Sequence, residues 1–187
     1  EYEFHSINVS GGKNVGGLFG VLKNTSTSST TVAVSGKTTD GAITTNVTSE
    51  SEVTNLGGLI GAYDTVASTD GNSAAVMKNT LAIKGTFNSA GSDISAVSTG
   101  GSKANTTYGG VIGAVSGSSY VVIENVSVST ADMKNSTTTS VGGLVGKLND
   151  GFLNVGNVTI TTAGDNDLSY GADQVEGHGG LVGHLVK

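Results

Sequence analysis

Three histidines and one acidic segment are the residues of this chain whose types could support metal binding or catalysis. His178 and His184 flank one predicted strand at even spacing, which places them about 20 Å apart along it. That separation is too long for two ligands of one metal ion. We therefore interpret both residues, and His5, as exposed polar positions. Asp165-Asn166-Asp167, with Asp173 nearby, offers oxygen ligands for calcium but lacks the spacing of a known calcium loop, so a solvated loop is the favoured interpretation.

No set of residues predicts catalysis. With 23 serines and three histidines, a chance Ser-His-Asp pairing is always available, and no particular set stands out. Glu50 and Glu52 form a carboxylate pair, but nothing marks either one as a proton donor. The chain has no cysteine, which excludes thiol nucleophiles and thiolate metal sites. We predict a non-enzymatic protein that needs no metal and no cofactor.

One short motif, which occurs five times, organises the elements that would position these residues. A glycine pair, two apolar residues and a third glycine keep their places in every copy, and the first glycines of successive copies are 41, 52, 33 and 37 residues apart. The structural residues of the motif are Gly16, Gly17, Leu18, Gly20, Gly57, Gly58, Leu59, Gly61, Gly109, Gly110, Val111, Gly113, Gly142, Gly143, Leu144, Gly146, Gly179, Gly180, Leu181 and Gly183.

The motif pattern predicts a strand whose alternate residues face a core. In the fourth copy Leu144, Gly146 and Leu148 would face inward. The position after the third glycine, which is Val21, Ala62, Ala114, Lys147 or His184, tolerates charged and polar residues and would face water in every copy. The third glycine would then lie against a neighbouring wall of the protein. Because residues are inserted between the motifs and not within them, we expect stacked units whose five motifs form one ladder.

Composition favours an all-β fold. The chain contains 36% hydrophobic residues, 30 glycines and no proline, and residues that favour helices are scarce. A second family of strands includes Tyr2–Val9, Val32–Val34, Thr80–Ile83, Glu124–Val128 and Gly156–Ile160, and a third alternation occurs at Ile43–Val47 and Ile94–Val97.

We therefore predict a single domain, an all-β parallel β-solenoid (β-helix) of about five stacked coils, right-handed and with roughly three strands per coil. The full repeats would span residues 15–55, 56–107, 108–140 and 141–177, with partial repeats at 1–14 and 178–187.

Asparagine occurs in seven Asn-X-Ser/Thr sequences, where composition alone predicts about four. Asn8, Asn125 and Asn157 share a place in the second strand family and would form a hydrogen-bonded column of side chains. Four other sites are expected in loops and would be open to glycosylation: Asn24, Asn46, Asn105 and Asn135.

The repeated Gly-Gly-Leu-hydrophobic-Gly pattern resembles the GLUG motif, which occurs in tandem in large bacterial and archaeal surface proteins, including adhesins and certain surface peptidases. Residues 16–20, 57–61, 142–146 and 179–183 match the motif directly, and residues 109–113 depart from it only by Val111 in place of leucine. The resemblance implies an extracellular or cell-surface β-helical stalk or adhesive region. It carries no catalytic residue onto any position of this chain.

Charge and hydropathy exclude two classes of partner. A net charge of −6 argues against nucleic acid, which needs clustered basic residues. No stretch approaches the roughly 20 apolar residues of a membrane span, so no membrane insertion is expected. The threonine tracts share no column, which disfavours an ice-binding face.

Two interpretations of function remain. The first is a structural or adhesive module. Because the chain opens on a second-family strand, Tyr2–Val9, and closes on a motif strand, Gly179–Val186, we interpret it either as a piece cut from a longer array of a surface protein or as a subunit that associates with itself head to tail. The second is a module that binds a cell-surface or glycan ligand through side loops, such as 64–76 or 86–107.

Overall fold

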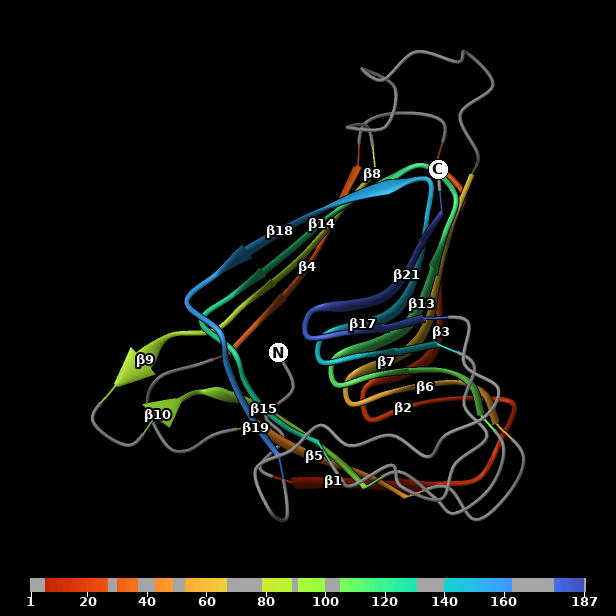
Figure 1. Cartoon of the computed structure of the whole chain (residues 1–187). Helices are drawn as coiled ribbons and strands as arrows, with labels where there is room; N and C mark the ends of the chain where they lie inside the picture. Colours follow the sequence, from red (N-terminus) through yellow and green to blue (C-terminus); the bar gives the residue numbers. More distant parts are fainter. Residues whose placement is uncertain are drawn as a thin grey trace.

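Strands are the elements of this structure. The computed structural model describes residues 6–26, 30–36, 43–48, 53–66, 79–88, 91–99, 105–130, 140–162 and 177–186. Within these ranges the chain forms 21 strands and no helix (Figure 1). The prediction of an all-β chain is confirmed.

Four parallel sheets, which we name sheets A to D, contain all the described strands except one antiparallel hairpin. Sheet A contains β1 (Ser6–Ser10), β5 (Ile43–Thr48), β11 (Ile94–Thr99), β15 (Ser127–Thr130) and β19 (Thr159–Thr162). Sheet B contains β2 (Asn14–Gly16), β6 (Val53–Gly57), β12 (Asn105–Gly109), β16 (Ser140–Gly142) and β20 (Gly177–Gly179). Sheet C contains β3 (Phe19–Asn24), β7 (Ile60–Thr65), β13 (Ile112–Ser116), β17 (Val145–Asn149) and β21 (Val182–Val186). Sheet D contains β4 (Thr30–Ser35), β8 (Asn79–Lys84), β14 (Ser119–Glu124) and β18 (Gly151–Gly156), and the hairpin is β9 (Phe87–Asn88) with β10 (Gly91–Ser92).

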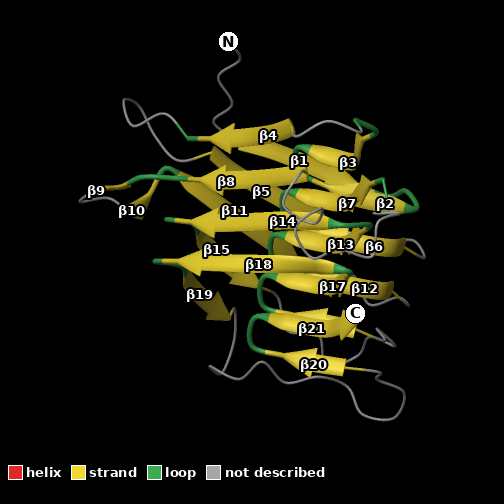
Figure 2. Cartoon of the chain, turned by 90° about the horizontal axis from the view of Figure 1, so that it is seen from above, coloured by secondary structure: helices red, strands yellow, loops and turns green. Residues whose placement is uncertain are grey.

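The chain passes through the sheets in the order A, B, C and D and then returns to sheet A beside its previous strand. We call one such passage a circuit. Figure 2 shows the strands of successive circuits lying beside one another in each sheet. Parallel stacking of this kind is compatible with a β-solenoid, since every strand pairs with the circuits on either side.

The prediction of roughly three strands per coil is wrong, because a circuit contains strands of four sheets. The predicted second strand family combined strands that belong to two different sheets, D and A. Val32–Val34 lies in β4 of sheet D, whereas Ile7–Val9 lies in β1 of sheet A. The segment Glu124–Val128 runs around the corner that joins sheet D to sheet A. The third alternation, at Ile43–Val47 and Ile94–Val97, lies in β5 and β11 of sheet A.

The five motifs form one ladder, as predicted. Their first glycines are register neighbours in sheet B: Gly16, Gly57, Gly109, Gly142 and Gly179. Their second apolar residues are register neighbours in sheet C: Phe19, Ile60, Ile112, Val145 and Val182. The predicted repeat boundaries, placed beside the motif, fall within strands of sheet B.

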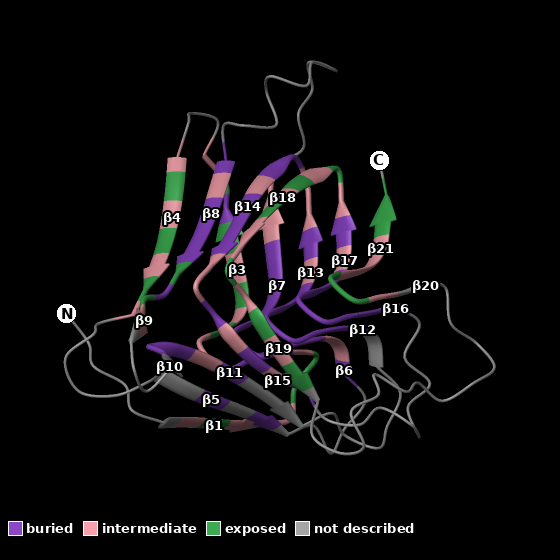
Figure 3. Cartoon of the chain, turned by 60° about the vertical axis from the view of Figure 1, so that its left-hand side comes forward, coloured by how far each residue is buried: buried purple, intermediate pink, exposed green. Residues whose placement is uncertain are grey.

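Two clusters of buried apolar side chains fill the space between the sheets. Figure 3 colours the strands by burial and shows the buried residues in purple. The larger cluster combines residues of sheets C, D and A, such as Ile112, Val121 and Val128. The smaller cluster lies between sheets A and B and includes Val47 and Leu56. Sheet B therefore contributes its apolar side chains to a core that it shares with sheet A and that is separate from the larger cluster.

The predicted alternation of inward and outward residues holds only in part. Leu144, Gly146 and Leu148 are buried, but Val145 between them is buried as well. Leu144 lies in the bend before β17 and not in a strand, and the amide groups of Leu144 and Val145 both donate to the carbonyl oxygen of Leu181, at 3.0 Å each. The bend interrupts the two-residue alternation, so two successive side chains enter the core.

The position after the third glycine varies in exposure. Val21 is 41% exposed, as predicted, and Lys147 and His184 are half-buried. Ala62 at the same position is buried, so the prediction of a water-facing column is wrong at that circuit.

Candidate functional site

Each motif folds into a narrow bend between sheet B and sheet C. The sheet B strand ends at the first glycine, the second glycine and the next residue form the bend, and the sheet C strand begins at the second apolar residue. We call this strand-bend-strand unit the glycine arch. In Figure 1 the arches lie one behind another near the middle of the molecule. Their stacking brings sheets B and C face to face.

The first and third glycines allow the backbones of sheets B and C to touch. A Cβ atom on Gly113 would lie 2.5 Å from the carbonyl oxygen of Gly61 and 2.7 Å from the amide nitrogen of Leu56. A Cβ atom on Gly57 would lie 2.6 Å from the amide nitrogen of Gly113. The same approach joins Gly16 to Gly61, Gly109 to Gly146 and Gly142 to Gly183. Sheet B is therefore the wall that the sequence predicted beside the third glycine.

The second glycine makes room for sheet A of the following circuit. A Cβ atom on Gly58 would lie 2.9 Å from the Cβ atom of Ala96, and one on Gly143 would lie 3.0 Å from Cδ1 of Ile160. Gly17 faces Thr45 and Gly110 faces Val128 in the same way. The bend of each arch thus touches sheet A, and the two apolar cores lie on either side of this contact.

The first apolar residue of the motif forms a buried column. Leu59, Val111 and Leu144 are fully buried, and each donates its amide hydrogen to, or accepts one from, its neighbour in the column. Burial of each such side chain stabilises the fold by roughly 1.5–3 kcal/mol. The glycines of the motif therefore allow close packing, and its apolar residues pack in the core.

A polar column that sequence reasoning missed runs along sheet B. Asn55 Nδ2 donates to Asn14 Oδ1 at 2.7 Å, and Thr107 Oγ1 donates to Asn55 Oδ1 at 2.5 Å. Ser140 and Gly177 occupy the next two register positions. A small or polar residue two positions before each glycine pair was the signal that could have revealed this column.

The predicted asparagine column exists at the corner between sheets D and A, but with different members. Asn157 Nδ2 donates to Asn125 Oδ1 at 2.9 Å. Both residues have positive φ, 54° for Asn125 and 51° for Asn157, a conformation that asparagine tolerates better than most residues. Asn8 lies elsewhere, because its register neighbour is Asn46 within sheet A.

Asp93 takes the place that was predicted for Asn8. It lies two residues before Ser95, which is the register neighbour of Ser127, so Asp93 corresponds to Asn125. The carboxyl group is buried, and Oδ1 accepts a hydrogen bond from the Thr86 amide at 2.6 Å. Oδ2 has no hydrogen-bond partner among the described residues. The Asp93 carboxyl group thus closes the β9–β10 hairpin.

The predicted glycosylation site at Asn24 is contradicted by burial. Asn24 is the last residue of β3, and Nδ2 donates to Thr30 Oγ1 at 2.8 Å and to Asn79 Oδ1 at 3.3 Å. An oligosaccharide on this buried amide would disrupt the cluster. Burial also raises the pKa of the nearby Tyr63 hydroxyl above its ordinary value of 10.0, and the Asn24 side chain acts in the opposite direction.

Of the other predicted glycosylation sites, Asn46 and Asn105 have a described backbone only, and Asn135 is not described. Asn46 lies in β5 and Asn105 in β12, so both belong to strands and not to loops. Asn135 lies outside the described residues.

The candidate catalytic and metal-binding residues are not brought together. His178 lies in β20 and His184 in β21, on opposite sides of the bend, so the assignment to one strand with a separation of about 20 Å is wrong. His5, Glu50, Glu52, Asp165-Asn166-Asp167 and Asp173 lie outside the described residues. In the parts of the chain that the structure describes, no three His, Asp or Glu residues are grouped to hold a metal ion.

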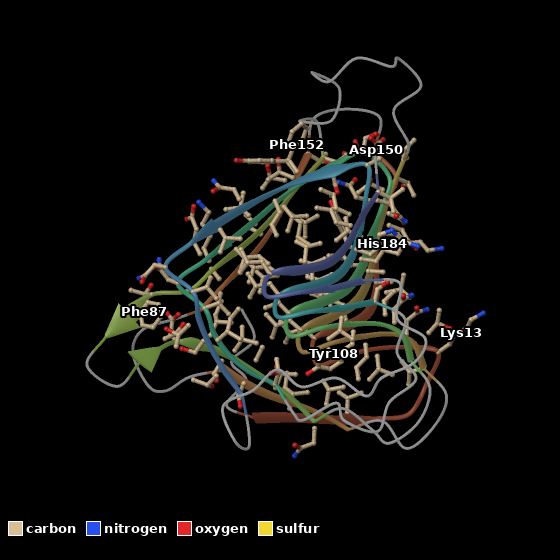
Figure 4. All side chains as sticks on the ribbon, viewed as in Figure 1. Lys13, Phe87, Tyr108, Asp150, Phe152 and His184 are labelled. Carbon is tan, nitrogen blue, oxygen red and sulfur yellow. The ribbon has the colours of Figure 1, made fainter. Side chains whose placement is uncertain are left out.

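Exposed large apolar side chains of the described residues include Phe19 and Val21 in β3, Val66 after β7, and two further groups. Leu181, Leu185 and Val186 lie on the last described circuit, and Leu185 is 64% exposed. Tyr120 and Phe152 are register neighbours in sheet D, and Phe152 points away from the core (Figure 4). These surfaces are the candidates for contact with a partner.

The described ranges include no helix of the length and apolar character that a membrane crossing requires. Comparison of the chain with protein-family models, with curated protein sequences and with solved structures finds no match.

Proposed function

We propose that this chain is a non-enzymatic structural and adhesive module of an extracellular or cell-surface protein, built as a right-handed β-solenoid of about five stacked coils. The observation that carries the proposal is the use of the motif residues. Every repeated glycine except Gly180 admits a neighbouring backbone or side chain, and the central members of the Leu and Val column, Leu59, Val111 and Leu144, enter the core. A sequence that repeats only packing residues is typical of solenoids, which act by extending a surface.

The proposed location depends on the sequence pattern. The five motifs resemble the GLUG repeats of large surface proteins, and the ladder in which they stack suits a stalk that holds a binding region away from a cell. The absence of cysteine is compatible with export by a route that forms no disulfides.

Protease treatment of intact producing cells tests this location. We expect an antibody against the chain to label intact cells and the signal to disappear after protease treatment, while a cytosolic marker survives. A signal that appears only after lysis would contradict the proposal.

Recognition of a glycan is the second candidate function, because Tyr120 and Phe152 form a pair of aromatic side chains on the outer face of sheet D. Aromatic rings on a flat face can pack against the apolar faces of sugars. The loops that the sequence suggested for binding lie partly outside the described residues, whereas this pair lies in strands.

Phe152→Ala is expected to abolish any binding that the chain shows on a glycan array. Phe19→Ala is the matched control, since Phe19 is similarly exposed, 39% against 45%, but lies in sheet C at the far end of the stack. Equal binding by the two variants, or no binding by the unmodified chain, would contradict the second function.

A further inference from the structure

The outer face of sheet A carries two columns of small uncharged polar residues. In β11 and β15 the buried Ala96 and Val128 alternate with the half-buried Ser95, Ser127 and Ser129. Each column takes one residue from each of the five strands of the sheet. The first column is Ser6, Thr44, Ser95, Ser127 and Thr159, and the second is Asn8, Asn46, Val97, Ser129 and Thr161. We call these ten positions the polar face.

The composition of the polar face differs from that of the chain. Nine of its ten positions are Ser, Thr or Asn, whereas these types make up 62 of the 187 residues, about a third. None of the ten is charged, although sheet D carries the ion pair of Lys84 with Glu124 at 3.0 Å. Five of the nine polar positions lie in β5, β11 and β15, which are paired on both edges. The pattern therefore does not depend on the edge strands.

Hydroxyl groups of the polar face are available to a ligand. Those of Ser95, Ser127 and Ser129 form no hydrogen bond with another described residue, whereas Thr161 Oγ1 donates to the Val128 carbonyl oxygen at 3.2 Å. Each free hydroxyl can both donate and accept a hydrogen bond. Because every such bond replaces one with water, a single contact adds little affinity. A ligand of this face must therefore use many contacts at once.

The two columns repeat at the spacing of the stacked strands. Each column offers a side chain about every 4.8 Å along the stack, which is close to the length of one sugar unit in an extended polysaccharide. The columns are two residues apart along each strand, about 6.6 Å, and the residues between them, such as Ala96 and Val128, are buried. A strip bounded by two rows of polar side chains thus runs along the stack, and a chain of sugars lying on it would meet one strand with each unit.

Other classes of partner fit the polar face less well. It has no charge for nucleic acid or an acidic polysaccharide, and it has no aromatic anchor of the kind that dominates protein interfaces. The prediction that the threonine tracts share no column is wrong, because Thr44 and Thr159 share the first one. In Figure 1, however, the strands of sheet A turn progressively from β1 to β19. A polymer chain can follow such a twist, and the flat lattice of ice cannot.

We propose that the polar face binds a neutral polysaccharide chain, which lies along the stack with its hydroxyl groups hydrogen-bonded to the two columns. Affinity comes from the sum of many weak contacts, so a long chain binds more tightly than a short oligosaccharide. This inference rests on the proposed adhesive function and gives it a ligand class. The site is separate from the pair of Tyr120 and Phe152 on sheet D, which would hold a short glycan by stacking.

The double variant Ser127→Ala with Ser129→Ala tests the site, because it removes one hydroxyl group from each column and adds no bulk. Both side chains are half-buried on the outer face, so we expect an unchanged melting temperature. We expect about tenfold weaker retention on amorphous cellulose, a neutral and extended polysaccharide. Depletion of the protein from the supernatant over a concentration series measures the affinity. Retention of the unmodified chain is expected to persist at high salt, because no charge takes part.

The double variant Thr31→Ala with Thr80→Ala is the matched control. It removes two hydroxyl groups from register neighbours on the outer face of sheet D, where Thr31 is exposed and Thr80 is half-buried. We expect it to be retained like the unmodified chain. Equal retention of the two double variants would overturn the proposal. A loss of retention confined to Phe152→Ala would overturn it as well, since binding would then belong to sheet D.

An unmodified chain that is retained neither by cellulose nor by mannan, a second neutral polysaccharide, would also overturn the proposal. Retention by acidic polygalacturonate alone, abolished by high salt, would do the same. Protease treatment of intact cells does not depend on polysaccharide binding, so the failure of this inference and the failure of the proposed surface function are distinguishable.

Discussion

Leu144→Asp is expected to lower the free energy of unfolding by more than about 4 kcal/mol, enough to prevent folding in a domain of ordinary stability. Leu144 is fully buried in the larger core, between Val111 and Leu181 of the same column. The substitution removes apolar burial worth roughly 1.5–3 kcal/mol and places a carboxylate where no charged partner compensates for its lost hydration. Thermal unfolding followed by circular dichroism measures the change.

Lys147→Asp is the control for that substitution. Lys147 lies three residues further along the same motif and is half-buried, and its side chain already carries a charge. We expect its free energy of unfolding to change by no more than about 1 kcal/mol. Equal melting temperatures for the two variants would show that Leu144 does not face the core.

Gly113→Ala is expected to destabilise the chain by about 3 kcal/mol or more, although it adds a single methyl group. The new Cβ atom would lie 2.5 Å from the Gly61 carbonyl oxygen and 2.7 and 2.9 Å from backbone atoms of Leu56. All three are backbone atoms of paired strands, so no side-chain rotation can relieve the collision. Sheets B and C would have to separate, and denaturant unfolding measures that cost.

Gly156→Ala is the matched control. The nearest atom to its Cβ would be Cγ of Glu124 at 3.3 Å, which belongs to a flexible side chain at the surface. We expect this variant to be as stable as the unmodified chain or slightly more stable, because alanine restricts the unfolded state. If Gly113→Ala melts at the same temperature as Gly156→Ala, the two sheets are not in backbone contact.

The ladder of motifs could be predicted because the pattern itself specifies it. Every copy repeats glycine and apolar residues at the same places, and a register shift by one residue would bury the wrong face. The third glycine also indicated a close neighbour. That neighbour is sheet B of the preceding circuit. It could not be identified from the sequence, because the motif was interpreted as one strand, whereas the chain bends at Gly58 and its equivalents.

The separation of sheets D and A was missed for a local reason. From Asn125 to Val128 polar and apolar residues alternate, and no glycine or proline separates this alternation from the apolar residues of β14, so the segment is typical of a continuous strand. The corner comes from the left-handed backbone conformation of Asn125. Asparagine adopts this conformation more readily than most residues, so no glycine marks the corner in the sequence.

Asp93 and the smaller core were hidden by different effects. The β9–β10 hairpin precedes Asp93 and separates it from the Thr80–Ile83 strand, which concealed its match with Asn125. The smaller core could have been predicted from residues just outside the motif, which the prediction from the motif alone did not include. An apolar residue immediately before the glycine pair occurs as Val15, Leu56, Tyr108 and Val141, and all four are buried there.

The distance between spin labels at Val21 and His184 tests the stacked ladder most directly. These residues occupy one register column, through Ala62, Ala114 and Lys147, and the cysteine-free chain allows labels on introduced cysteines alone. Four steps of about 4.8 Å predict a separation of about 19 Å between their Cα atoms, against about 14 Å for Val21 and Lys147. Electron paramagnetic resonance on labelled protein diluted with unlabelled protein should show this increase. A separation that does not grow from Lys147 to His184, or that exceeds about 30 Å, would contradict the ladder.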